Sequence, residues 1–231
     1  MYHQLESLIL DLEENTMQTN PNNVFVYWDN SNIFHEAQRL AEENNGSTDA
    51  RYRVRIHFNN LLNLALANRT LQSAFAAGSI PPDLQNLWNR LENEGVEVRL
   101  FDRGNSNLGE QQVPDGWLRE RMLEDALRND KNPGIVVLLT GDGSGYSQGS
   151  GFHTALELLH EKGWGIELLS WRHSCKRLMR EWVERNGVFI ALDDFYNSIT
   201  FLEPSRPGQP LAHPRDPEQL DLTRRPTVNM G

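Results

Sequence analysis

The sequence predicts an α/β domain in three layers, with helices on both faces of a mainly parallel sheet. Strand-like and helix-like segments alternate from about residue 24 to residue 202, which is the pattern of repeated βαβ units. Residues 135–139 are apolar at every position, as in a strand that is buried on both faces. The length of 231 residues is sufficient for one domain with a sizeable core.

Each expected element follows from a local pattern. Short β-branched or apolar runs predict the strands, and apolar residues three or four positions apart predict the helices. The expected strands are 24–28, 70–76, 96–101, 135–139, 166–169 and 188–192. The expected helices are 29–40, 58–66, 81–94, 115–126, 152–161 and 175–185, several of them bounded by Pro or Gly. Together these elements form one predicted domain over residues 24–202.

The two ends of the chain have different patterns. Residues 1–23 place Leu5, Leu8, Ile9 and Leu12 on one helix face, which predicts a short amphipathic helix that packs on the domain or lies in solvent. The alternative is a helix that binds a partner, including a second copy of this chain in a homodimer. Residues 203–231 are rich in Pro and have almost no apolar periodicity, which predicts a disordered tail.

Composition restricts the class of protein. The chain has 22 Lys and Arg against 32 Asp and Glu, a formal net charge of −10, which argues against coating of nucleic acid by charge alone. A single cysteine, Cys175, excludes an internal disulfide and a cysteine-rich zinc site. No apolar run is long enough to cross a membrane, and the first residues do not have a secretory pattern. We expect no membrane partner and a cytoplasmic location, with the nucleus as the alternative.

Three aspartates follow or precede strands in a way that suggests a metal site. Asp29 follows the first strand directly, Asp142 follows the most apolar strand, and Asp115 opens the helix that leads into that strand. Functional crevices in parallel sheets lie at the carboxyl ends of the strands, where these side chains can meet. Their oxygen atoms suit Mg²⁺ or Mn²⁺. Taken singly, each aspartate could equally serve as a helix cap.

The sequence around these aspartates resembles the motifs of the NYN domain family of PIN-like nucleases. The similar stretches are residues 26–33 (Val-Tyr-Trp-Asp-Asn-Ser-Asn-Ile), 113–118 (Val-Pro-Asp-Gly-Trp-Leu) and 137–143 (Val-Leu-Leu-Thr-Gly-Asp-Gly). The resemblance implies a three-layer PIN-like, Rossmann-like fold and an acidic cluster of Asp29, Asp115 and Asp142 that binds divalent metal and cuts RNA. Many relatives have a second aspartate two places after the acid of the third motif. This sequence has Ser144 there, which could weaken one metal site.

Other polar residues are candidates for substrate contact. Asn30, Asn32 and Ser144 could position a metal-bound water or a substrate phosphate, since an amide donates and accepts without added charge. For the two asparagines, capping or a surface position on the helix is about as plausible. The bases Arg172, Lys176, Arg177 and Arg180 predict a strip that contacts RNA phosphates, with three of them four positions apart on one helix face. An ordinary solvated helix face is the alternative.

The resulting prediction is a metal-dependent ribonuclease that hydrolyses phosphodiester bonds, and we expect it to act within the RNA chain. A second reading is a non-catalytic RNA-binding or scaffolding module of the same fold, which Ser144 and the acidic composition favour. A third is a phosphatase or nucleotide-binding domain. The sequence lacks an Asp-x-Asp pair after the first strand, and the glycine-rich stretch 141–151 lacks the Gly-Lys-Ser/Thr ending of a phosphate loop.

Overall fold

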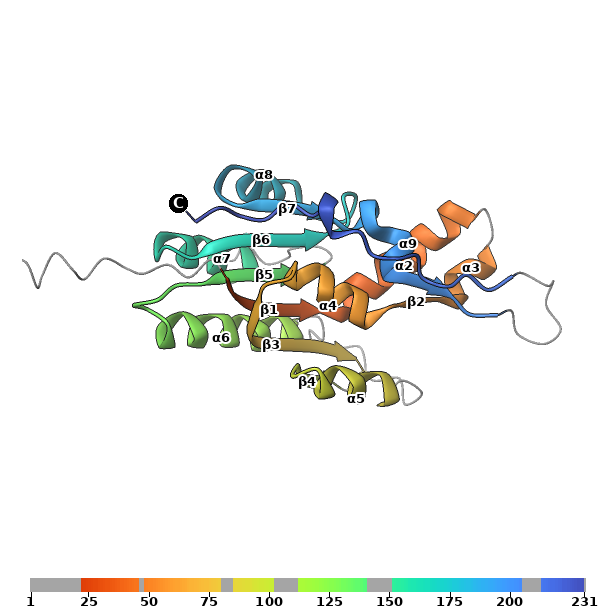
Figure 1. Ribbon diagram of the computed structural model, residues 1–231, viewed down its shortest axis with the longest axis horizontal. Coiled ribbons are helices and arrows are strands. Elements are labelled where there is room, and N and C mark those ends of the chain that lie inside the picture. Colours follow the sequence, from red (N-terminus) through yellow and green to blue (C-terminus); the bar gives the residue numbers. More distant parts are fainter. Residues whose placement is uncertain are drawn as a thin grey trace, which may run out of the picture.

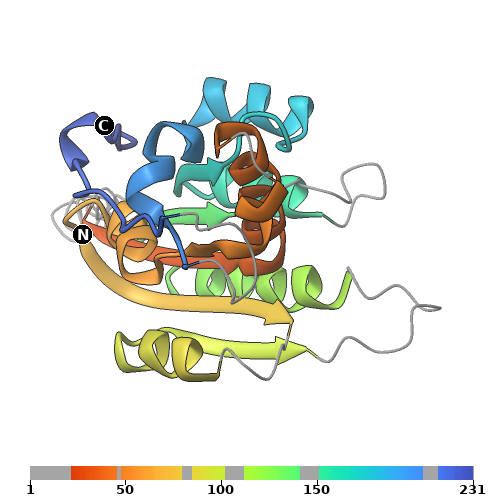
Figure 2. The same ribbon diagram turned by 90° about the vertical axis from the view of Figure 1, so that its right-hand side faces the viewer.

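The computed structural model describes residues 22–45, 48–79, 85–101, 112–140, 151–204 and 213–230, and it confirms the predicted α/β/α architecture (Figure 1). Within these residues the main sheet has six parallel strands in the order β4-β3-β1-β5-β6-β7, from bottom to top in Figure 1. The strands are β1 (Asn23–Asp29), β3 (Thr70–Ser79), β4 (Glu97–Phe101), β5 (Ile135–Leu139), β6 (Gly165–Ser170) and β7 (Val188–Ala191). Figure 2 shows the same layers from the side, with β4 at the bottom and α8 at the top.

The centre of the sheet is the pair β1 and β5. All five residues of β5 are buried, and β1 is buried from its second residue to its last. Trp28 pairs with Leu139, and Leu139 pairs with Leu169 of β6, so these three strands end at nearly the same level. Because the strands are parallel, their carboxyl ends form one edge of the sheet.

Alternating side chains of the strands build two separate cores. Val24, Val26 and Trp28 point to the face that carries α2 (Asn30–Asn45), α4 (Phe58–Leu66) and α5 (Gln85–Asn93). Phe25 and Tyr27 point to the face that carries α6 (Gln112–Arg128), α7 (Phe152–Glu161) and α8 (Arg177–Asn186). Because its side chains alternate between the two faces, β1 contributes to the cores beneath both helix layers.

A second, smaller sheet was not predicted from the sequence. After α3 (Thr48–Arg53), strand β2 (Val54–Ile56) pairs antiparallel with β8 (Thr200–Leu202). Between β7 and β8 the chain forms a 3₁₀ helix, η3 (Leu192–Phe195), followed directly by α9 (Tyr196–Ile199). Strands of three residues are too short to show a periodicity, so these two could not be predicted from the sequence.

The prediction of a disordered tail over residues 203–231 is wrong for residues 213–230, which we call the C-terminal segment. This segment lies against the domain and includes a short 3₁₀ helix, η4 (Leu222–Arg224). Four of its apolar residues pack on the core of the α2–α4–α5 face: Leu220, Leu222, Val228 and Met230. Most of the segment is extended and has no helical or strand period, so pattern reading could not detect the packing. Residues 205–212 and 231 lie outside the described residues.

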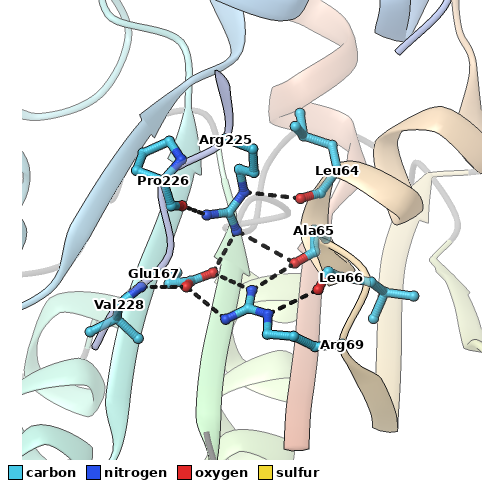
Figure 3. A network of polar contacts seen from close by, with 8 residues as sticks. All are labelled: Leu64, Ala65, Leu66, Arg69, Glu167, Arg225, Pro226 and Val228. Carbon is cyan, nitrogen blue, oxygen red and sulfur yellow. Dashed lines mark hydrogen bonds and ion pairs between the residues drawn. The ribbon is translucent and has the colours of Figure 1, made fainter. Parts of the chain in front are cut away.

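A buried ionic network holds the C-terminal segment on the sheet (Figure 3). Glu167, in the middle of β6, is fully buried and accepts two hydrogen bonds from Arg69, at 2.8 and 2.7 Å. Arg225 of the segment pairs with the same carboxylate, donates to the carbonyl of Leu64 at 3.0 Å, and is itself buried. The backbone N–H of Val228 completes the network with a 2.8 Å bond to Glu167 Oε1.

The predicted N-terminal helix with Leu5, Leu8, Ile9 and Leu12 lies outside the described residues, so it stays a prediction, as does a homodimer through it. Among the helices that the structure describes, none has the length and apolar character needed to span a bilayer.

Candidate active site

Asp29 is the last residue of β1 and is held in one orientation by polar neighbours. It is 2% exposed. Asn32 donates its side-chain Nδ2–H to Asp29 Oδ2 at 2.6 Å and its backbone N–H to Oδ1 at 3.4 Å. The hydroxyl of Thr140, which follows β5, donates to Oδ2 at 3.4 Å. Asp29 therefore does cap α2, as the alternative interpretation allowed, and its carboxylate also lies at the carboxyl edge of the central strand pair.

Asn30 and Asn32 have different surroundings although both were predicted to position substrate. Asn32 is hydrogen-bonded to Asp29, so it orients that carboxylate. Asn30 is 9% exposed, and no donor among the described residues reaches its Oδ1. A buried amide oxygen without a donor typically costs about 1–3 kcal/mol. An oxygen left in this state, on the residue that follows Asp29, is the kind of group that a divalent cation or its bound water would satisfy.

Asp115 lies at the same edge of the sheet as Asp29. The helix α6 begins at Gln112, so Asp115 is inside the first turn and is half-buried, whereas the sequence predicted that it opens the helix. Trp117, two residues later, packs against Phe75 of β3 and Phe101, the last residue of β4, with ring centroids 5.9 and 6.4 Å away. These contacts place the N-terminal part of α6 beside the middle of β3 and the carboxyl end of β4.

The position of α6 is set further along by a buried polar group that sequence reasoning did not find. Asp125 is 5% exposed and accepts the hydroxyl of Tyr27 at 2.7 Å and that of Ser73 at 2.6 Å, both to Oδ2. Burial raises the pKa of Tyr27 well above its usual value, and the neighbouring charge of Asp125 raises it further, so the phenol stays protonated and donates. This network joins α6 to β1 and β3, the two strands next to the site.

Asp142 and Ser144 lie outside the described residues, so the predicted three-carboxylate cluster is described only for Asp29 and Asp115. In the described part of the chain no group of three or more His, Cys, Asp or Glu side chains is close enough to hold a metal ion. The donors that are described are carboxylate and amide oxygens, with Asn30 Oδ1 among them, and this set fits Mg²⁺ or Mn²⁺. It does not fit a softer metal that needs Cys or His.

Thr140 is a further candidate that the sequence analysis did not single out. It follows β5, is fully buried, and donates its backbone N–H to the carbonyl of Leu169 at 3.3 Å. This bond fixes the start of the connection after β5 next to β6, and the side-chain hydroxyl faces Asp29. Its position between an apolar strand and Gly141-Asp142 was the signal available in the sequence.

The four bases of the predicted basic strip do not lie on a single helix face. Helix α8 begins at Arg177, so Arg172 lies in the turn before it, and the prediction that Arg172, Lys176 and Arg180 share a helix face is wrong for Arg172. The guanidinium of Arg172 pairs with Asp194, and the carbonyl of Arg172 accepts a 3.2 Å bond from Arg180. The bases still gather after the carboxyl end of β6, close to the same edge of the sheet.

The remaining bases of the strip are exposed to solvent or paired loosely. Lys176 occupies the position just before α8, makes no capping hydrogen bond through its side chain, and is exposed. Arg177 lies 3.8 Å from Glu181, and Arg180 lies 3.8 Å from Glu184. Such surface pairs contribute little to stability and are readily exchanged for other anions, so these side chains can reach a phosphate.

The parallel three-layer fold, with Asp29 at the carboxyl end of its central strand, is consistent with a PIN-like, nuclease-type domain. The family model of the NYN domain matches residues 23–184, and the chain belongs to this family. The match covers β1 to most of α8 and ends before β7, η3, α9, β8 and the C-terminal segment. No curated protein is similar enough to the chain to count as a match.

Proposed function

We propose that the protein is a metal-dependent ribonuclease that hydrolyses phosphodiester bonds within RNA at the carboxyl edge of its sheet. NYN domains are RNA-directed, nuclease-type modules, and this membership gives the general class. The observation that carries the proposal is Asp29, a buried carboxylate at the end of the central strand that hydrogen bonds from Asn32 and Thr140 orient. The residue that follows it, Asn30, has a buried amide oxygen that no described donor reaches.

The carboxylates of Asp29, Asp115 and Asp142 would hold Mg²⁺ or Mn²⁺, with Asn30 Oδ1 as a ligand or as the acceptor of a metal-bound water. The ion would lower the pKa of water and offset charge on the phosphate oxygens. The water oxygen bonds to phosphorus, the bond from phosphorus to the leaving ribose oxygen breaks, and that oxygen takes up a proton. Asn32 and Thr140 keep Asp29 in one orientation, because each donates a hydrogen bond to its carboxylate.

Substrate would be held by the bases that follow β6. Arg172, Lys176, Arg177 and Arg180 would contact RNA phosphates, which gives affinity without base specificity. Four cations at one edge can act on a local stretch of RNA even though the chain as a whole is acidic, since Coulomb interactions are screened beyond about 8–10 Å at physiological salt.

A non-catalytic RNA-binding module is the second candidate, and Ser144 is the observation that favours it. If a carboxylate at that position were needed for a second ion, the fold and the basic strip would still bind RNA. The two candidates make opposite predictions for cleavage and the same prediction for binding.

A cleavage assay on circular single-stranded RNA separates the two. With Mn²⁺ or Mg²⁺ we expect the circle to be opened, which requires cutting within the chain. Asp29→Asn, Asp115→Asn and Asp142→Asn should each lower the rate by about a hundredfold or more, the usual scale for loss of a metal-site group. Glu120→Gln, an exposed carboxylate on the same helix as Asp115, is the matched control and should cleave like the unmodified protein. Binding of the circle without cleavage under either metal would exclude the nuclease and leave the binding module.

A further inference from the structure

Arg215, in the C-terminal segment, is bonded tightly to α9. Its guanidinium donates to the carbonyls of Asn197 and Thr200, each at 3.0 Å, and to the hydroxyl of Thr200 at 2.7 Å. The same guanidinium lies over the ring of Tyr196, 5.3 Å from its centroid. The backbone of Arg215 forms a two-bond antiparallel bridge with Leu202 at 2.8 and 3.1 Å. One side chain thus fixes both ends of α9.

The residues just before α9 hold Arg172. Asp193 of η3 accepts the backbone N–H of Arg172 at 2.8 Å, and Asp194 pairs with its guanidinium. Tyr196, the first residue of α9, packs against Trp171 with ring centroids 6.2 Å apart. Because η3 continues into α9 without a break, a shift of α9 would be passed directly to the two aspartates.

Arg172 itself lies next to the candidate active site. It is two residues beyond the end of β6, and β6 is two strands from β1, a lateral distance of about 10 Å. Its neighbour Trp171 is fully buried and donates its ring N–H to the carbonyl of Ile33 in α2 at 3.0 Å. Trp171 and Arg172 therefore join the helix that follows Asp29 to η3.

We propose that Arg215 is a positioning residue for substrate binding: it holds α9 and η3 so that Asp193 and Asp194 keep Arg172 directed along the carboxyl edge of the sheet. The proposal rests on the proposed function where it concerns RNA, but the positioning of Arg172 is independent of it. It also gives a role at the active site to a part of the chain that lies beyond the match to the NYN family model.

The geometry of the guanidinium distinguishes positioning from a simple effect of charge. Arg215 bonds three oxygen atoms at once, which a planar fork can do and a lysine ammonium at the same place cannot reproduce. Arg215→Lys keeps the positive charge and loses most of this bonding. If Arg215 acted on RNA through its charge alone, lysine would replace it.

The first measurement is the hydrogen-exchange rate of the Arg172 amide, whose N–H is bonded to Asp193. In Arg215→Lys we expect this amide to exchange about tenfold faster or more, because its acceptor is no longer held, while amides of β5 in the sheet centre keep their rates.

The second measurement is the binding of single-stranded RNA in the presence of Mg²⁺. Arg215→Lys should bind the RNA roughly three- to tenfold more weakly than the unmodified protein, about as Arg172→Ala does, and the double variant should bind little more weakly than either single variant. Arg224→Ala removes an exposed arginine of the same segment and is the matched control, with unchanged exchange at Arg172.

A second variant keeps the proposal testable if Arg215→Lys does not fold. Glu218→Ala removes a 2.9 Å bond from Asn197 of α9 to the C-terminal segment at an exposed position, and should speed exchange at Arg172 by about threefold. Unchanged exchange at Arg172 in the folded variants, whichever of the two is tested, would overturn the proposal. Faster exchange together with no RNA binding by any form of the protein would support the positioning by Arg215 and contradict the proposed function instead.

Discussion

Two buried carboxylates on the central sheet are satisfied in opposite ways. Glu167 accepts hydrogen bonds from two arginines and a backbone N–H, so its negative charge is balanced inside the protein. The described hydrogen bonds to Asp29 come from the side chain and backbone of Asn32 and from the hydroxyl of Thr140, none of which carries positive charge. The strand registers place Glu167 three residues, about 10 Å, back from the level of Asp29.

The difference suggests how carboxylates that stabilise this fold can be distinguished from carboxylates that take part in binding or catalysis. A carboxylate in mid-strand with cationic partners joins separate segments, here β6, the end of α4 and the C-terminal segment. Asp29 lies instead at a strand end, on the edge of the sheet where ligands bind in folds of this kind, and its described hydrogen bonds come from Asn32 and Thr140. Buried titratable groups at such an edge are candidates for binding or chemistry.

The largest effect that the comparison predicts is on stability. Glu167→Gln removes the charge that balances Arg225, whose side chain is fully buried, and Arg69, whose side chain is 9% exposed. Removing one member of a buried ionic group typically costs about 3–5 kcal/mol. We expect the free energy of unfolding in urea to fall by that amount. The surface pair Arg121 with Glu124 provides the control: Glu124→Gln should cost less than about 1 kcal/mol. Equal losses in the two variants would contradict a structural role for Glu167.

Acid should weaken the same network. Burial alone raises the pKa of Glu167, but the hydrogen bonds and charges of Arg69 and Arg225 outweigh it, so the folded pKa lies below its ordinary value of 4.5. A lowered folded pKa means that the network stabilises fully above pH 4.5 and that this contribution is lost as the pH falls through the folded value. The stability difference between the unmodified protein and Glu167→Gln should therefore be constant near neutral pH and narrow below about pH 4. A difference that stays constant down to about pH 3 would mean that the pKa of Glu167 is the same in the folded and unfolded protein, so that the arginines do not favour its charged form.

The sequence identified the parts of the molecule that have a local signal. The six long strand segments and the position of Asp29 follow from apolar runs and the residue after them. Glu167 was visible only as a charged residue inside a short strand, because its partners Arg69 and Arg225 are 98 and 58 residues away in sequence. The C-terminal segment was missed for the same reason. Its packing depends on individual buried side chains and not on a repeating pattern, so composition alone predicted disorder.

The candidate site, like the fold, could be predicted from the sequence only where the signal is local. The motif around Asp29 placed Asn30 and Asn32 beside it, but only the structure separates the asparagine that orients Asp29 from the one with a buried oxygen that no described donor reaches. Arg172 was assigned to a helix by its spacing of four from Lys176. Helix α8 begins only at Arg177. Arg172 lies before it and is bonded to η3, which lies about twenty residues further along the chain and which no local pattern could reveal.

The smallest effect on stability is expected at Asp29. Asn has nearly the same shape as Asp, and in Asp29→Asn its side-chain oxygen can still accept the hydrogen bond from Asn32. The substitution also removes a buried negative charge. Because the main change is one of charge and not of shape, we expect the free energy of unfolding to change by less than about 1.5 kcal/mol. Urea unfolding without added metal measures this directly.

Urea unfolding with Mn²⁺ present tests the metal site as well. A bound ion would stabilise the unmodified protein by mass action and leave the stability of Asp29→Asn almost unchanged. A loss of several kcal/mol in Asp29→Asn without metal would instead mean that Asp29, like Glu167, holds the structure together, and the distinction between the two carboxylates would fail.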